Sequence, residues 1–79
     1  MITEEQIFAC IHKVNAHLDT NAMSAEGDLR KMGLDSLDMF SLLLELQELT
    51  GVEIPDEDIP SVQSVAKLRE YLVARSVGT

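Results

Sequence analysis

Aromatic residues are scarce in this chain: there is no tryptophan, and 79 residues include only two phenylalanines and one tyrosine. An aromatic core is therefore excluded. Hydrophobic residues still make up 46% of the chain, so disorder is not expected and the core must consist of Leu, Ile, Val and Met. The length suits one domain. We expect a single domain over 1–79, with its core at about 3–75 and a tail at 76–79.

Cysteine and long apolar segments are scarce as well. Cys10 is the single cysteine, which excludes an internal disulfide and fits a reducing compartment. No apolar run approaches the ~20 residues that span a bilayer. The N-terminus lacks the basic and then apolar layout of a signal peptide. We therefore expect a soluble cytoplasmic protein without membrane insertion.

Positive charge is missing from the middle of the chain. No Lys or Arg occurs from Met32 to Ala66, and the net charge of the whole chain is −8. Acidic residues occupy the same stretch: Asp35, Asp38, Glu45, Glu48, Glu53, Asp56, Glu57 and Asp58. They would repel a phosphate backbone, which argues against nucleic-acid binding. An acidic surface favours encounters with basic protein partners, but charge that serves only solubility explains the composition equally well.

No segment shows a strong strand pattern, whereas four segments show helical signals. The first helix is predicted from about Glu4 to about Leu18, with Thr3 as its N-cap and Gln6 as the capping-box partner. A loop of 17 residues, Asp19–Asp35, follows and is rich in Asn, Asp, Ser and Gly. Loops of this length are often functional. Spaced apolar residues should anchor it on the core: Leu29, Met32 and Leu34.

The second helix is predicted from Ser36 to Thr50, with Gly51 as its stop signal. At 100° per residue, one narrow polar stripe contains Asp38, Ser41, Glu45 and Glu48. Apolar residues fill most of the remaining circumference: Leu37, Met39, Phe40, Leu42, Leu43, Leu44, Leu46 and Leu49. A helix so widely apolar is expected to be packed on several sides, as the central helix of a small bundle.

Two further helical segments complete the pattern. Pro55 suits the start of a short helix that Pro60 would close. Ser61 is predicted to cap the last helix, whose inner stripe would be Val62, Val65, Leu68 and Leu72. The expected fold is all-α: a small four-helix bundle with a long loop between helices 1 and 2 and a short third helix.

No catalytic or metal-binding constellation is visible. The sequence contains no evident pair of nucleophile and base, so we do not expect an enzyme. The acidic segment around Pro55 lacks the alternating ligands and central glycine of a calcium loop, so we expect no metal site.

Ser36 lies in the stretch G-L-D-S-L-D and allows two interpretations. Either Asp35 or Ser36 could simply cap the second helix. Alternatively, the serine is an attachment point, because a negatively charged group there would meet free N–H groups and the positive end of the helix dipole. The acidic stripe begins beside it and could guide partners.

The ordered set G-L-D-S-L-D, then E-I-P-D-E-D, then S-V-Q-S-V resembles the acyl carrier protein family over about Thr3 to Leu72. The resemblance implies a four-helix bundle in which Ser36 carries 4'-phosphopantetheine, placed there from coenzyme A by a phosphopantetheinyl transferase. A thiol at the end of that arm would hold acyl groups as thioesters. The resemblance also implies a monomer that docks on acyl-loading and acyl-processing enzymes through their basic patches. The candidate docking residues are Asp35, Leu37, Asp38, Met39, Glu45, Glu48, Glu53, Asp56, Glu57 and Asp58.

The chain departs from that family in places. Members that serve fatty-acid biosynthesis usually have an acidic residue where this chain has Ser41, and the last helix, with Lys67, Arg69 and Arg75, is more basic than usual. Fatty-acid biosynthesis and a dedicated, polyketide-like pathway therefore both stay open. An aminoacyl carrier, or an acidic binding module without a prosthetic group, is the alternative.

Overall fold

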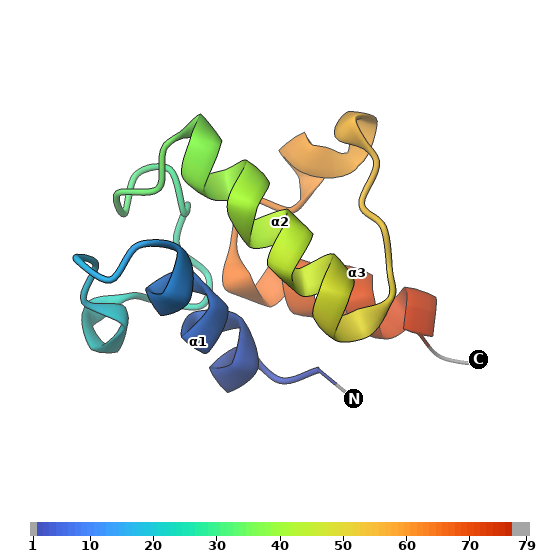
Figure 1. Ribbon diagram of the computed structural model, residues 1–79, viewed down its shortest axis with the longest axis horizontal. Helices are drawn as coiled ribbons and strands as arrows, with labels where there is room; N and C mark the ends of the chain where they lie inside the picture. The colour runs from blue at the N-terminus through green and yellow to red at the C-terminus, as the bar shows by residue number, and fades with distance from the viewer. Residues whose placement is uncertain (1, 77–79) are drawn as a thin grey trace.

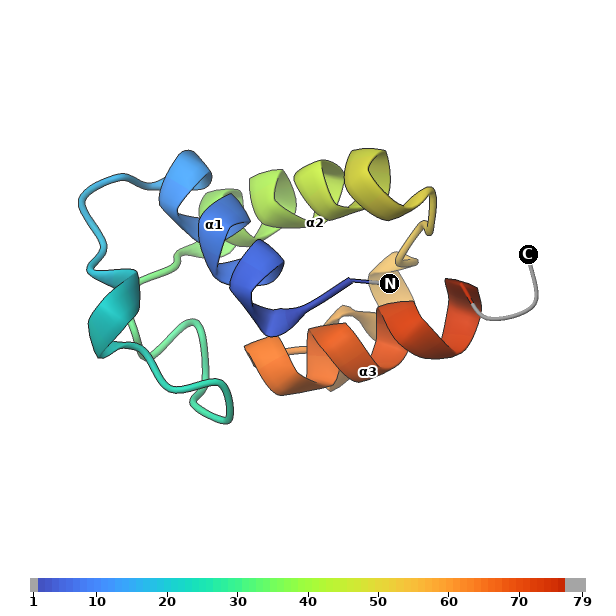
Figure 2. The ribbon, with the colours of Figure 1, turned by 90° about the horizontal axis from the view of Figure 1, so that it is seen from below.

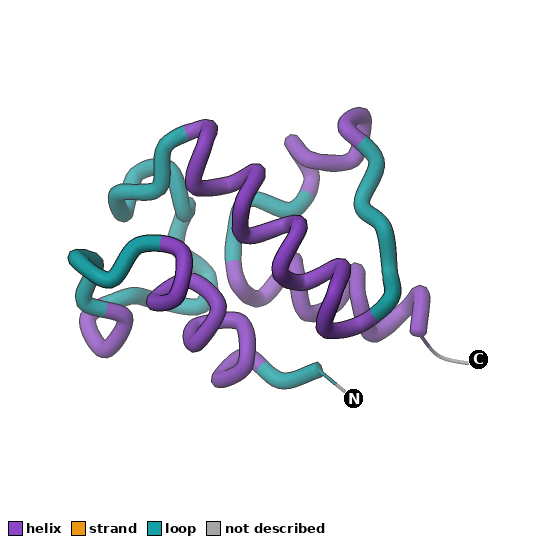
Figure 3. Tube along the Cα trace, viewed as in Figure 1, coloured by secondary structure: helices purple, strands orange, loops and turns teal. Residues whose placement is uncertain are grey.

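The computed structural model describes residues 2–76, and all regular structure in that range is helical (Figures 1 and 3). The elements are the α-helices α1 (Glu4–Val14), α2 (Ser36–Thr50) and α3 (Val65–Ser76), with the 3-10 helices η1 (Thr20–Ala22) and η2 (Asp56–Ser61). Four of them, α1, α2, η2 and α3, are the four predicted helices, and η1 is one turn within the long loop. The all-α class is confirmed. Most of the predicted tail, residues 77–79, lies outside the described residues.

The helices enclose one aliphatic core. Figure 2 shows α2 and α3 as two layers with α1 beside both, and α1 packs against each of them. No aromatic side chain is buried among the described residues, as the composition predicts. The buried hydrophobic residues are Ile2, Ile7, Ile11, Leu29, Leu34, Met39, Leu42, Leu43, Leu46, Val62, Val65, Leu68 and Leu72.

The start of α1 follows the prediction and its end does not. Thr3 and Gln6 form the capping box: the Gln6 N–H donates to Thr3 Oγ1 over 3.2 Å, and the Thr3 N–H donates to Gln6 Oε1 over 2.9 Å. The helix ends at Val14 rather than at Leu18. Asn15 adopts an extended backbone (φ −144°), and its Oδ1 accepts from the His17 N–H over 3.1 Å. This local side-chain bond competes with further helix.

The long loop is anchored on the core as predicted. Leu29 and Leu34 are buried, and Met32 packs against the core. Two backbone bonds of 2.8 Å join the loop to the region where α3 starts: Leu29 N–H to Gln63 O, and Ala66 N–H to Ala25 O. These bonds hold Ala25 and Leu29 in place, so the part of the loop that leads into α2 starts from a fixed position.

Gly33 allows the chain to turn into α2. Its φ is +119°, which side-chain-bearing residues rarely adopt, and a Cβ there would lie 2.7 Å from Leu18 Cδ2. The helix α2 then spans the predicted Ser36–Thr50 and ends at Gly51 in the left-handed conformation (φ 74°).

The last two helices begin and end differently from the prediction. Pro60 does not close η2 but lies inside it. The helix α3 begins at Val65, and its cap is Ser64 rather than Ser61, since the Lys67 N–H donates to Ser64 Oγ over 3.2 Å. The bond from the Leu29 N–H to Gln63 O fixes the chain just before α3. The helix therefore starts later in the sequence than predicted, at Val65.

Candidate functional site at the start of α2

Asp35, and not Ser36, caps α2. Asp35 Oδ1 accepts from the Asp38 N–H over 2.8 Å, and Asp35 O accepts from the Met39 N–H over 2.9 Å. Ser36 is the first helical residue and is exposed. Within residues 2–76 its hydroxyl makes no hydrogen bond. The capping interpretation of Ser36 is therefore excluded, and its hydroxyl oxygen is accessible for covalent modification.

The first turn of α2 also leaves backbone donors available. The N–H groups of Ser36 and Leu37 have no acceptor within the part of the chain that the structure describes. Such groups, with the positive end of the helix dipole, favour a negative charge beside them. The negatively charged carboxylate of Asp35 is already stabilised in this way by the bond from the Asp38 N–H.

The outward face of α2 is apolar rather than acidic. Leu37, Phe40 and Leu44, which we name the apolar strip, are 72%, 55% and 47% exposed. Their spacing of three and four residues places them on one face of the helix. The expectation that α2 is packed on several sides is therefore wrong along this face. Leu49, near the end of the helix, is exposed as well.

Met39 was predicted to dock partners, but the structure places its side chain in the core. Its side chain is 4% exposed and belongs to the core, together with Leu42, Leu43 and Leu46. Met39 lies one residue before Phe40 on the helix, and a step of about 100° separates the inner face from the outer face there.

The polar stripe of α2 faces α1 instead of open solvent. Asp38 Oδ2 accepts from Asn15 Nδ2 over 3.3 Å, and Glu45 Oε2 pairs with Lys13 Nζ at 3.0 Å. The hydrogen bond to Glu45 raises the pKa of Lys13, with a further contribution from the charge of Glu45. Among the predicted docking acids of this stripe, only Glu48 is fully exposed.

A depression of about 130 Å³ lies between α2 and the segment that contains η2. Its walls are the apolar side chains Phe40, Leu43, Leu44, Ile54 and Ile59, with Gln47, Glu53 and Asp56 as polar lining residues. Glu53, Asp56 and Glu57 are exposed, whereas Asp58 is half-buried. Phe40 and Leu44 thus belong both to the apolar strip and to the wall of the depression.

A second, open groove of about 470 Å³ runs between α1 and α2 and contains Cys10. The thiol is half-buried. Burial raises the pKa of Cys10, and the negative charge of Glu45 raises it further. A thiol kept protonated is a poor nucleophile, so Cys10 is not suited to covalent chemistry.

Within residues 2–76, no cluster of three or more His, Cys, Asp or Glu side chains is arranged to bind a metal ion. In the same range, no helix has the length and apolarity needed to cross a membrane.

Comparison with known proteins assigns the fold and this site to a class. Residues 5–72 match the family described as the phosphopantetheine attachment site. An acyl carrier protein of Rubrobacter xylanophilus is 33% identical over 73 residues, which cover 87% of this chain and 90% of that protein. A chloroplastic acyl carrier protein of Casuarina glauca is 32% identical over 96% of this chain and 58% of its own length. A mitochondrial one from Neurospora crassa is 28% identical over 94% of this chain and 59% of its own length.

The chain is thus a domain of the kind that bears a covalent 4'-phosphopantetheine group. It belongs to the acyl carrier protein family. Members of this family are non-catalytic carriers, so the protein is not an enzyme. They interact with phosphopantetheinyl transferases and acyl-processing enzymes.

The residues at the start of α2 fit such a group. It requires an accessible hydroxyl for the phosphodiester bond, and the Ser36 oxygen is exposed and has no hydrogen-bond partner within the described residues. It also carries a negative charge, and the N–H groups of Ser36 and Leu37 can donate hydrogen bonds to its phosphate oxygens.

Proposed function

We propose that Ser36 is the residue that bears the phosphopantetheine arm of this acyl carrier protein. The observation that carries the proposal is that Asp35 and Ser36, which are neighbours at the start of α2, have different roles. Asp35 supplies the cap bond to the Asp38 N–H, so the neighbouring hydroxyl is left exposed and unbonded. When bound, the group supplies a flexible arm that ends in a thiol, to which acyl groups are attached.

The chain's own residues position and stabilise the arm but do not activate its attachment. A serine hydroxyl needs a neighbouring base to become a nucleophile. The adjacent carboxylate of Asp35 is engaged with the Asp38 N–H, and no histidine lies on α2. The transferase must therefore supply the base. The N–H groups of Ser36 and Leu37 would stabilise the charge of the phosphodiester once it is formed.

We further propose that partner enzymes dock on the apolar strip rather than on the polar stripe. An enzyme that reaches Ser36 must cover Leu37 and Phe40, one and four residues along the same helix. Apolar and aromatic side chains that are exposed and become buried supply most of the binding energy in interfaces. The partner surface should therefore offer an apolar pocket for Phe40.

Acidic residues belong to the rim of this docking surface. Asp35, Glu48, Glu53, Asp56 and Glu57 are exposed and make no ion pair within the described residues. Cationic side chains of the partner can pair with these acids. Such pairs would influence the orientation of the partner and the rate of association more than the affinity. Asp38 and Glu45 contribute less, because Asn15 and Lys13 already engage them.

The cargo and pathway are proposed from the sequence. The relatives are named acyl carrier proteins, which supports acyl transfer in fatty-acid or polyketide-like biosynthesis. Ser41 and the basic last helix favour a dedicated pathway, and an aminoacyl load is the alternative. The single cysteine supports a reducing compartment such as the cytoplasm.

Counting thiols tests the attachment proposal. The chain has one cysteine, so the denatured protein should present one thiol before and two after incubation with coenzyme A, Mg²⁺ and a broad-specificity phosphopantetheinyl transferase. The variant Ser36→Ala should stay at one thiol. The control Ser24→Ala, which removes an exposed loop serine, should gain the second thiol at the wild-type rate.

A wild-type protein that keeps one thiol would refute the attachment and favour an acidic binding module without a prosthetic group. A second thiol that still forms on Ser36→Ala would mean that another residue bears the arm.

A further inference from the structure

The 3-10 helix η2 packs against the core through the half-buried side chain of Ile59. None of its residues, Asp56–Ser61, is buried. It nevertheless forms one wall of the depression beside α2, through Asp56 and Ile59. A small displacement of η2 would therefore change the width of this depression.

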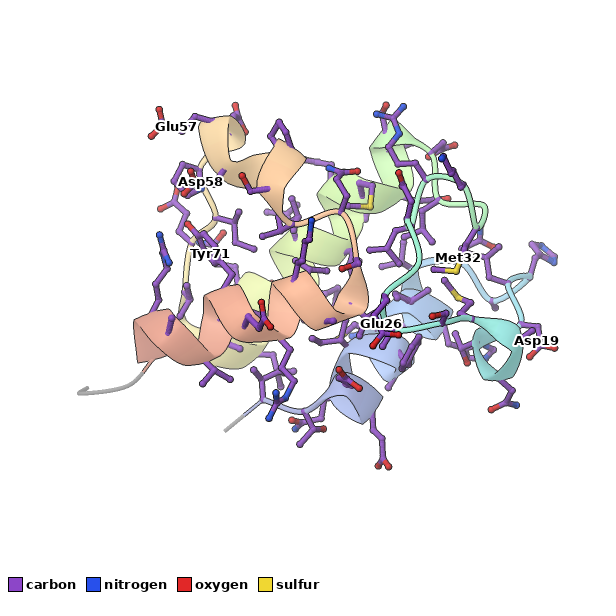
Figure 4. The ribbon with its side chains drawn as sticks, turned by 180° about the vertical axis from the view of Figure 1, so that it is seen from behind. Asp19, Glu26, Met32, Glu57, Asp58 and Tyr71 are labelled. Carbon is purple, nitrogen blue, oxygen red and sulfur yellow. The ribbon has the colours of Figure 1, made fainter. Side chains whose placement is uncertain are left out.

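One side chain of η2 is tied to α3 by a short bond. Tyr71 Oη donates to Asp58 Oδ2 over 2.7 Å. Figure 4 shows these two side chains close together, while Glu57, the preceding residue, points away from the body. The bond to Asp58 raises the pKa of Tyr71, as does partial desolvation, so the phenol stays a donor at neutral pH.

Arg75 completes the cluster from the next turn of α3. Its guanidinium carbon lies 3.6 Å from the centroid of the Tyr71 ring, within the range of a cation–π interaction. Its Nη2 is 3.9 Å from Asp58 Oδ2, at the outer limit of an ion pair. We name Asp58, Tyr71 and Arg75 the latch.

We propose that the latch keeps η2 closed beside the depression, and that a cation of a docked partner opens it by taking Asp58 away from Tyr71 and Arg75. This inference rests on the proposed docking of basic partner enzymes. It makes docking and opening one event: an enzyme bound over α2 and η2 would also widen the depression that Phe40 and Ile59 line.

The ion pair in the latch is weak enough for a partner cation to displace it. The side chains of Arg75 and Asp58 are 48% and 34% exposed, and ion pairs of this kind contribute little net energy. A partner arginine could instead bind the Asp58 carboxylate through two parallel bonds, which is a stronger arrangement. Asp56 and Glu57, both exposed, would attract that cation to the same segment.

Amide hydrogen exchange of the unmodified protein tests the latch. The reporter is the Val62 N–H, which donates to Ile59 O over 3.1 Å at the end of η2. Tyr71→Phe removes the donor to Asp58 and should speed Val62 exchange by about tenfold, as expected for losing one bond to a charged acceptor. Asp58→Asn keeps an acceptor but loses the charge and the ion pair with Arg75, so it should speed the exchange by a smaller factor. Amides in the middle of α2 should keep their rates. The control Glu57→Gln changes a charge of η2 that makes no bond in the described residues and should leave Val62 at the wild-type rate.

A second arm tests the opening by a cation. Tetraarginine should speed Val62 exchange in the wild-type protein more than NaCl of equal ionic strength, and should add little in Tyr71→Phe. Equal exchange in the wild type and both latch variants would overturn the proposal, as would an acceleration that spreads equally over α2. An effect of tetraarginine no larger than that of NaCl would overturn the opening by a cation. Because Ser36 stays unmodified throughout, failure here is distinct from failure of the attachment proposal.

Discussion

At the scale of single residues, the site depends on which of two neighbours caps the helix. Asp35 and Ser36 are both good N-cap residues, and the structure gives the cap to Asp35. The serine hydroxyl is therefore available as the proposed tether, and a partner that reaches it would also contact Leu37 and Phe40. These residues, rather than the acids of the polar stripe, should decide how tightly an enzyme binds.

Phe40 provides a test at this scale. Replacing Phe40 by Ala should lower the kcat/KM with which a phosphopantetheinyl transferase loads the protein by about tenfold, because an exposed aromatic anchor is lost from the interface. Circular dichroism and the melting temperature should stay close to wild type, since the ring is 55% exposed. The control Gln47→Ala, at an exposed polar position of the same helix, should have little effect. Equal kcat/KM for the wild type and the Phe40 variant would exclude docking on the apolar strip.

At the scale of the element, α2 is delimited by signals that act locally. Asp35 bonds a backbone N–H three residues later, and Gly51 adopts the left-handed conformation that ends the helix. Both residues stand at the helix ends that the sequence predicts. The two ends of the helix are therefore set by local signals, and its first hydroxyl is exposed to solvent.

Stability measurements can separate the cap from the tether. Asp35→Ala should lower the free energy of unfolding by about 1 kcal/mol, the usual cost of a lost N-cap, whereas Asp35→Asn should retain most of it. Ser36→Ala should change stability by less than about 0.5 kcal/mol, because its hydroxyl makes no bond in the described structure. Urea denaturation measures all three. A larger loss for Ser36→Ala than for Asp35→Ala would show that the capping assignment is reversed.

The difference between local contacts and contacts between distant residues explains which features the sequence could not predict. Thr3 and Gln6 act within three residues, so this capping box was correctly predicted, and the cap of α2 was narrowed to Asp35 or Ser36. The rotation of α2 about its own axis depends on residues far away in the chain: the polar stripe lies beside α1, where Glu45 pairs with Lys13, 32 positions earlier. Leu37 and Leu42 are chemically identical, and only packing decides that one is exposed and the other buried. The start of α3 was wrong for the same reason, because the distant bond from the Leu29 N–H to Gln63 O fixes the chain before it. The end of α1 is instead a local effect, set by the bond from the His17 N–H to Asn15 Oδ1.

At the scale of the whole molecule, charge is the property that stands out. The net charge is −8, and the stretch from Asp35 to Asp58 contains no cation. The fold relieves part of the repulsion by bringing Lys13 to Glu45 and Arg75 to Asp58. The exposed acids around η2 keep no such partner within residues 2–76, which suits them for meeting a basic enzyme.

Salt should therefore stabilise the domain. Raising NaCl from low to moderate concentration screens the repulsion among the acids, and each 1 kcal/mol gained would raise the melting temperature by about 4–8 °C in a domain of this size. A variant with Glu53→Gln, Asp56→Asn and Glu57→Gln should melt higher at low salt and gain less from NaCl. Calorimetry measures both. A melting temperature that is flat or falls with salt in the wild type would contradict this reading of the charge.

Residue-level mapping by fragmentation mass spectrometry is the most direct test of the central claim. The protein is loaded by a transferase with coenzyme A, and the position of the added phosphopantetheine is located along the chain. The account predicts a single adduct on Ser36, with Ser24, Ser41, Ser61 and Ser64 unmodified. An adduct on any of those residues, or fully competent reagents that leave Ser36 bare, would contradict it.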